Sequence, residues 1–151
     1  LLVRAEAGLR MGALAAAGPG HFFAPAPTEP AATVGGVIAC EARGVFAGRY
    51  GGVREHVLGV ESLRSAAGRD VIASAVLRLL PKPRTLWGVA FLFSDEAAAG
   101  DFSREAALLA PVAVNEYLDA GTLRALTALR RSAGRLQALP ETGAAAARVY
   151  V

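Results

Sequence analysis

The chain has 151 residues, a length that fits one ordinary domain or two small ones. Hydrophobic residues make up 54% of it, but much of this is alanine, and no uncharged apolar run reaches the roughly 18 residues of a membrane-spanning helix, so no transmembrane segment is expected. The formal net charge of +3 comes from arginines scattered among acidic residues rather than from a basic block, which argues against a nucleic-acid-binding protein.

The first elements of the chain are short and alternate between strand and helix. Residues 2–5 are expected to form a strand and residues 9–17 a helix, which Gly18-Pro19-Gly20 ends. A brief apolar strand at residues 21–24 then enters a proline-rich loop. Because proline fixes φ near its polyproline value, residues 25–30 should run as a stiff, extended segment.

A glycine pair follows this loop at the start of a short predicted helix. Thr33 is the expected N-cap, and Gly35 and Gly36 lie in the first turn, where a ligand can approach the backbone N–H groups without a Cβ in its way. Phosphate suits this end of a helix because unpaired N–H groups and the positive end of the helix dipole meet there. The pattern predicts an anion-binding helix start beside an open groove. The alternative is a proline-rich turn with a glycine-loosened helix start and no ligand.

A glycine-rich stretch and a hairpin are expected next. Residues 43–52 hold four glycines, so their backbone should be irregular. The β-rich runs at residues 56–63 and 71–80 are joined by residues 65–69, which resemble a hairpin turn. The predicted groove would lie beside the first of these two strands.

Residues 81–83, Pro-Lys-Pro, predict a stiff boundary, after which a second pattern begins. Its order is strand, helix, strand, helix, strand, and Trp87 and Tyr117 are expected to pack in its core. The expected elements are strands at residues 86–93 and 112–118, a helix at residues 95–109 with Asp95 as N-cap, a helix capped by Asp119 that buries Leu123, Leu126 and Leu129, and a strand from residue 148.

Few residues indicate catalysis or metal binding. Cys40 is the only cysteine, so these residues form no disulfide or cysteine-based metal cluster. His21 and His56 are far apart and have no ligand partner at metal-binding spacing, so they are interpreted as surface or packing histidines. Glu116 and Asp119 are three residues apart, but a strand end and a helix cap explain them better than paired catalytic acids.

Five short motifs occur in the order found in a known family. They are P-A-P-T at residues 25–28, T-V-G-G at 33–36, Gly44, Tyr50-Gly51, and V-L-G-V-E at 57–61. This run is similar to the second half of the FAD-binding domain of the FAD-linked oxidases of the vanillyl-alcohol-oxidase or PCMH type. Within that family it most resembles the branch of the glycolate oxidase and D-lactate dehydrogenase flavin subunits.

Two later segments extend the resemblance over nearly the whole chain. L-R-L-L-P-K-P at residues 77–83 is similar to the exit strand of the FAD-binding domain, and N-E-Y-L-D at 115–119 to an early segment of the cap domain. The resemblance implies an α+β fold, with the second half of a PCMH-type FAD-binding domain at residues 1–80. The start of a ferredoxin-like α/β cap domain, whose helices stack on one face of an antiparallel sheet, would follow at residues 84–151.

The resemblance also implies a function. It points to a fragment of an FAD-dependent oxidoreductase that oxidises a small 2-hydroxy acid, with the flavin taking the hydride and passing electrons to an acceptor that the sequence does not identify. No catalytic residue and no metal ligand can be placed. The cofactor-binding residues that the resemblance implies are Pro27, Thr28, Thr33, Gly35, Gly36, Tyr50, Gly51, Val71 and Ile72.

Two departures from the family pattern leave an alternative open. The family's glycine-rich pyrophosphate loop belongs to a half of the domain that would precede Leu1, and the excursion that relatives carry between the two hairpin strands is reduced here to residues 62–70. We therefore expect these 151 residues alone to bind FAD weakly or not at all. The alternative is a truncated, cofactor-free remnant that acts at most as a structural or interaction module. The expected location is cytoplasmic, with peripheral attachment at the inner membrane as the other option.

Overall fold

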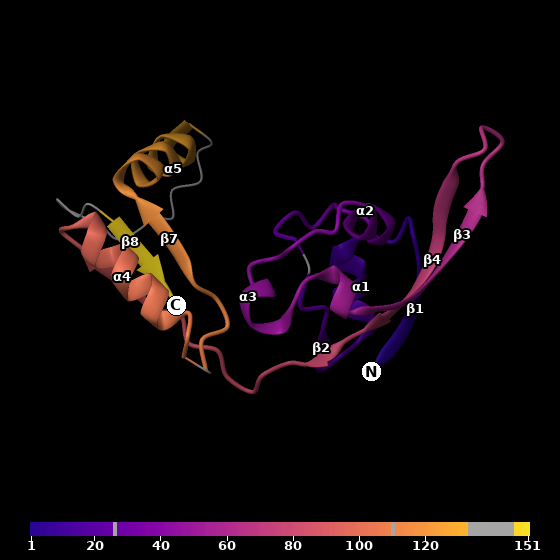
Figure 1. Ribbon diagram of the computed structural model, residues 1–151, viewed down its shortest axis with the longest axis horizontal. Coiled ribbons are helices and arrows are strands. Elements are labelled where there is room, and N and C mark those ends of the chain that lie inside the picture. The colour runs from indigo at the N-terminus through magenta and orange to yellow at the C-terminus, as the bar shows by residue number, and fades with distance from the viewer. Residues whose placement is uncertain (26, 110, 133–146) are drawn as a thin grey trace. The chain divides into compact units, whose positions relative to one another are not determined.

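The protein folds as two compact units, Leu1–Leu86 and Trp87–Val151 (Figure 1). The computed structural model describes residues 1–25, 27–109, 111–132 and 147–151. Both units mix helices with antiparallel strands, so the predicted α+β fold is confirmed. The division falls shortly after the predicted boundary at residues 81–83. Within the described part of the chain, no helix is both long and apolar enough to cross a membrane.

The first unit is built on an antiparallel three-stranded sheet with the order β1-β4-β3. The turn between β3 and β4 closes through a hydrogen bond of 2.7 Å from the Ser65 N–H to the Arg69 carbonyl, with Gly68 at φ +74°. The predicted hairpin is therefore confirmed. A separate two-stranded pair, β2 with β5, ends the unit. The strands are β1 (Leu2–Glu6), β2 (His21–Phe22), β3 (Val57–Arg64), β4 (Asp70–Arg78) and β5 (Leu80–Pro81).

The helices of the first unit are all short. The predicted helices after Leu9 and Thr33 are confirmed, but the expectation of irregular backbone throughout residues 43–52 is wrong, because a single helical turn forms there. Phe46 and Tyr50, four residues apart, pack their rings at 6.3 Å and stabilise that turn despite the neighbouring glycines. The helices are α1 (Met11–Ala17), α2 (Val34–Ala39), α3 (Ala47–Tyr50) and the 3₁₀ turn η1 (Val53–Glu55).

Alternation along the central strand creates the core of the first unit. Ala75, Leu77 and Leu79 point to one side and are all buried, as period-two patterning requires. Leu14 of α1 and Val34 of α2 cover them and are each only 1% exposed. The sheet therefore packs one face against the two helices, and β4 carries the largest share of the contact.

The far end of the β3–β4 hairpin lies away from this core (Figure 1). All of β3 beyond Val57 is exposed, and Leu58, Leu63 and Val71 each show more than half of their surface. The strand is also the edge of its sheet, paired with β4 alone. Two register irregularities, between Val57 and Gly59 and between Glu61 and Ser62, interrupt the pairing.

The second unit follows the predicted order of strand, helix, strand, helix and strand. The C-terminal strand β8 lies between the other two, so the sheet has the order β6-β8-β7, all antiparallel. Asp95 accepts hydrogen bonds from the N–H groups of Ala97 and Ala98, and Asp119 accepts one from Thr122. Both predicted helix caps are confirmed. The elements are β6 (Ala90–Phe93), α4 (Glu96–Ala106), β7 (Glu116–Asp119), α5 (Ala120–Ser132) and β8 (Ala147–Tyr150).

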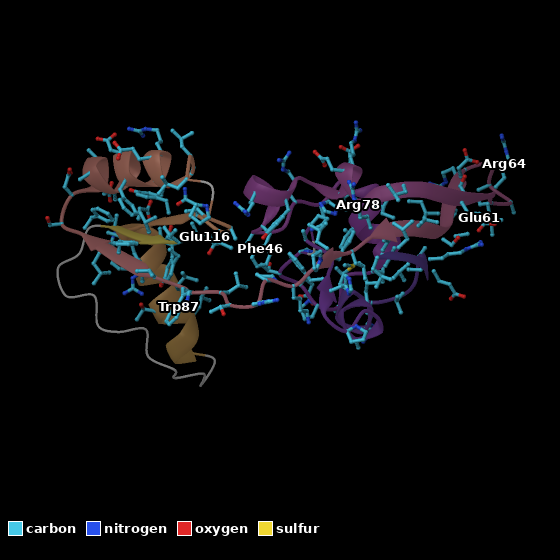
Figure 2. The ribbon with its side chains drawn as sticks, turned by 90° about the horizontal axis from the view of Figure 1, so that it is seen from below. Phe46, Glu61, Arg64, Arg78, Trp87 and Glu116 are labelled. Carbon is cyan, nitrogen blue, oxygen red and sulfur yellow. The ribbon has the colours of Figure 1, made fainter. Side chains whose placement is uncertain are left out.

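Four expectations for this unit are wrong. Tyr117 of β7 is 39% exposed rather than in the core. Trp87 is 85% exposed rather than in the core, because β6 begins only at Ala90 and Trp87 precedes the sheet (Figure 2). Leu129 is 64% exposed, so the buried face of α5 depends on Leu123 rather than on all three leucines. The helices do not share one face: Phe102 of α4 packs on one side of the sheet, and Figure 2 shows α5 on the other.

Candidate functional site

The start of α2 was predicted to bind an anion, but the backbone N–H groups there are hydrogen-bonded within the protein. Thr33 is the N-cap, as predicted, and its Oγ1 accepts a hydrogen bond of 3.3 Å from the Gly36 N–H. The Gly35 N–H donates to the Ala7 carbonyl at 2.8 Å, and the Val34 N–H donates to the Leu9 carbonyl at 2.9 Å. The N–H groups of this turn therefore already have protein partners. The expectation that they are free for phosphate is wrong.

The close approach at Gly35 explains why a glycine stands there. A Cβ at this position would lie 2.8 Å from the Cβ of Ala7, which is closer than real Cβ contacts come, and 3.2 Å from the Ala7 carbonyl oxygen, which is tighter than most of them. Gly36 differs, because it is exposed and a Cβ there would meet only the Thr33 hydroxyl at 3.2 Å. Gly35 thus serves the packing of α2 against the end of β1, and Gly36 is the glycine that faces outward.

Removing the N-cap should measurably weaken the fold. We expect Thr33→Ala to lower the free energy of unfolding by about 1 kcal/mol, because the Gly36 N–H loses its acceptor. Urea denaturation followed by far-ultraviolet circular dichroism measures the change. Thr28→Ala is the matched control, since Thr28 is exposed, and it should change stability by less than about 0.5 kcal/mol. Equal losses in the two variants would contradict the capping role.

The proline-rich loop is bound to α1. The Met11 N–H donates to the Ala32 carbonyl at 2.9 Å, and the Gly12 N–H donates to the Pro30 carbonyl at 3.3 Å. The loop therefore satisfies the first donors of α1, which has no side-chain cap of its own. Of the predicted site residues in the loop, Pro27 is half-buried and Thr28 is exposed.

Tyr50 belongs to an aromatic cluster in the first unit. Its ring meets Phe22 edge to face, with centroids 5.6 Å apart, and Phe22 meets Phe46 in the same way at 5.8 Å (Phe46 is labelled in Figure 2). Gly51 follows Tyr50 at φ +85°, a backbone conformation that favours glycine, so the chain turns sharply after the cluster. A cavity of about 200 Å³ opens beside these rings. We call it the aromatic cavity; its lining residues are Phe22, Phe46, Tyr50, Lys82, Pro83 and Leu86.

His56 holds the backbone of Tyr50 in place. The imidazole is 2% exposed, and its Nε2 lies 2.7 Å from the Tyr50 carbonyl oxygen, while Nδ1 lies 3.3 Å from the Arg78 carbonyl oxygen on β4. The ring therefore links α3 to the central sheet, which agrees with its interpretation as a packing residue. In the described ranges, no group of three His, Cys, Asp or Glu residues is placed to hold a metal ion.

A second, wider cavity lies along the three-stranded sheet. It has a volume of about 710 Å³ and includes Ile72, one of the predicted site residues. Among its lining residues, the Arg4 Nε donates to the Ser74 Oγ at 3.3 Å, the Ser74 hydroxyl donates to Glu61 at 2.8 Å, and Arg4 forms an ion pair with Glu61. The hydrogen bond from Ser74 and then the charge of Arg4 lower the pKa of Glu61.

The Ser74 hydroxyl should therefore control the titration of Glu61. We expect Ser74→Ala to raise the pKa of Glu61 toward its usual value, which carboxyl carbon chemical shifts recorded against pH would detect. Because the pKa is lowered by folding, the stabilisation from this network is complete above the usual glutamate pKa of about 4.3 and is lost as the pH falls through the lowered value. An unchanged titration curve in the variant would show that Arg4, and not Ser74, lowers the pKa of Glu61.

The predicted site residues all lie in the first unit but not in one cavity. Tyr50 lines the aromatic cavity and Ile72 lines the wider one, while Val71 is an exposed neighbour of the hairpin turn. The sequence did not identify Arg4 and Ser74 as lining residues of the wider cavity. It also did not identify Lys82 as a lining residue of the aromatic cavity. Arg4 and Ser74 are separated by 70 residues, so no local motif marks their contact.

Comparisons with known proteins give a match at the level of the fold. No protein-family model matches the chain, and the search of curated proteins gives no relative. Among solved structures, alkyldihydroxyacetonephosphate synthase, seen in two crystal forms, matches 99% of this chain with a TM-score of 0.71 and sequence identities of 13% and 14%. This chain spans 34% of each of those chains. The likeness covers both units and shows that this chain shares the fold of the matched part of those enzymes.

Proposed function

We propose that the chain is part of an FAD-linked oxidoreductase and that its first unit contributes to FAD binding. The observation that carries this proposal is the match of 99% of the chain to the FAD-binding oxidase fold. The five ordered motifs between residues 25 and 61 support it independently, because they belong to the sequence and not to the backbone path. Fold alone does not fix function, so the motifs are needed to choose among the uses of the fold.

The substrate class that we propose is a small 2-hydroxy acid such as glycolate or D-lactate. Its support is the resemblance of the motifs to the glycolate oxidase and D-lactate dehydrogenase branch. The solved neighbours are named for making alkyldihydroxyacetonephosphate, which is a different product. The proposed acid therefore depends on the motifs and not on the fold.

The closed start of α2 changes how the cofactor would be held. Since Gly35 and its neighbours already donate their N–H groups within the protein, the turn does not fit a phosphate held by backbone donors alone. Contacts between exposed groups and the cofactor agree better with this turn than phosphate binding by its backbone N–H groups does. Thr28 and Gly36 are both exposed. In this proposal Thr28 donates its hydroxyl to the cofactor and Gly36 allows close approach, while Gly35 is structural.

A second candidate is a cofactor-free structural or interaction module. The observation that favours it is the same closed helix start, because an FAD-binding turn with every donor satisfied has lost one means of holding phosphate. The two candidates differ in a single measurable property, the uptake of FAD.

The test is FAD uptake by the protein purified at the full length of its reading frame. We expect flavin absorption in the visible range after reconstitution, and bleaching of that absorption when glycolate or D-lactate is added without an acceptor. Thr28→Val should weaken FAD binding, whereas the same change at Thr127, another exposed threonine but in the second unit, should not. A full-length protein that stays colourless after incubation with excess FAD would leave the cofactor-free module as the function.

A further inference from the structure

We infer that the aromatic cavity is a binding site for a small aromatic acid, a ligand with one planar ring and one carboxylate. The inference stands on the side chains of the cavity itself and does not depend on FAD binding. Its lining residues come from β2, α3 and the segment after β5, all within the first unit.

The walls of the cavity favour an aromatic ligand. Phe22, Phe46 and Tyr50 already meet one another edge to face, with ring planes inclined by 63° to 84°. Rings arranged in this way present both faces and edges, which are the surfaces that another ring packs against in offset or T-shaped geometry. Pro83 and Leu86 complete an apolar lining. A planar ring therefore gains more contact here than a flexible aliphatic chain.

The size of the cavity limits the ligand to one ring. Its volume is about 200 Å³. An engineered apolar cavity of about 150 Å³ binds benzene, whereas pockets for drug-sized ligands begin at about 300 Å³. A benzene ring with one short substituent fits within these bounds, and a complete dinucleotide does not.

The charge of the lining selects an anion. Lys82 is the only one of the six lining residues that is charged at neutral pH. Its backbone is fixed, because its N–H donates to the Gly20 carbonyl at 2.9 Å beside the β2–β5 pair. The guanidinium carbon of Arg49 lies 5.4 Å from the Tyr50 ring centroid and adds positive charge nearby. A carboxylate on the ligand can thus pair with Lys82 while the ring enters among the aromatic walls.

The experiment is a set of titrations of the 151-residue chain followed by amide chemical shifts. Benzoate is the probe, benzyl alcohol keeps its ring without the charge, and cyclohexanecarboxylate keeps the charge without the aromatic ring. We expect saturable shifts at Phe46, Tyr50 and Lys82 with benzoate, and binding about fivefold weaker or worse with each of the other two compounds.

Variants locate the site. Lys82→Met should weaken benzoate binding about five- to tenfold, because the methionine keeps an apolar stem and removes the charge. Arg64→Met removes the charge of another exposed side chain, at the end of the hairpin, and should leave binding unchanged. Phe46→Leu should also weaken binding, and the amide chemical shifts of residues 47–50 report whether α3 has kept its structure. Lys82 is exposed, so its variant tests the site without risk to the fold.

Three results would overturn the inference. They are no saturable binding of benzoate, equal affinity in Lys82→Met and in the unaltered protein, or full displacement of benzoate by FAD, which would assign the cavity to a nucleotide ring. Benzoate binding by a protein that takes up no FAD would support the aromatic-acid site and count against the proposed oxidoreductase, so the two proposals fail separately.

Discussion

Leu77→Ala is expected to lower the free energy of unfolding of the first unit by about 2–5 kcal/mol. Leu77 is fully buried in the central strand β4, opposite Val3 of β1 and Val57 of β3. Strands on both sides prevent the sheet from closing over the cavity that the smaller side chain leaves. The free energy of unfolding of a small domain is about 5–15 kcal/mol, so a loss of this size would remove a large part of it.

The measurement is urea denaturation followed through the amide signals of β4, which report on the first unit by itself. Leu58→Ala is the control, because it makes the same chemical change on the neighbouring strand at a side chain that is 53% exposed. It should cost less than about 0.5 kcal/mol. A loss in Leu77→Ala no larger than in Leu58→Ala would show that the packing between β4 and the two helices does not stabilise the unit.

Gly35→Ala is expected to cost about 1–3 kcal/mol, although alanine is the better helix former. Its Cβ would lie 2.8 Å from the Ala7 Cβ and 3.2 Å from the Ala7 carbonyl oxygen, and neither atom belongs to a flexible side chain that can move aside. The hydrogen bond from Gly35 to Ala7 would lengthen as the helix shifts away. Thermal and urea denaturation of the variant measure the loss.

Two further variants test the cause. Gly48→Ala places a Cβ in α3 where no atom lies within 4 Å, so it should be neutral or stabilise by up to about 1 kcal/mol. Ala7→Gly combined with Gly35→Ala removes the closest clash and should recover part of the lost stability. If Gly35→Ala behaves like Gly48→Ala, the close packing of α2 on the end of β1 is not what requires a glycine.

The features that sequence predicted correctly are those set by nearby residues. Thr33, Asp95 and Asp119 were identified as caps because the N–H group that donates to a cap side chain lies only two or three residues after it. The hairpin turn at residues 65–69 is equally local. Trp87 was misplaced because apolar character alone does not show where a strand begins.

The candidate site depended on contacts that sequence does not reveal. The glycine pair predicted free N–H groups at the start of α2, but the N–H groups of Gly35 and Val34 donate to the carbonyl groups of Ala7 and Leu9, which lie 28 and 25 residues earlier in the chain. Arg4, Glu61 and Ser74 come from three different strands and meet only after the sheet forms. Local chemistry predicted the turn, and tertiary pairing decided whether its donors were free.

The outer edge of β3 carries a risk of self-association that the strand itself limits. An edge strand offers a row of backbone donors and acceptors to any other extended chain, and Leu58 and Leu63 would add apolar contact to such pairing. Glu61 and Arg64 place opposite charges on the same strand, and its two register irregularities prevent a long, flat ladder. The irregular pairing of β3 with β4 thus also opposes edge-to-edge pairing between copies of the protein.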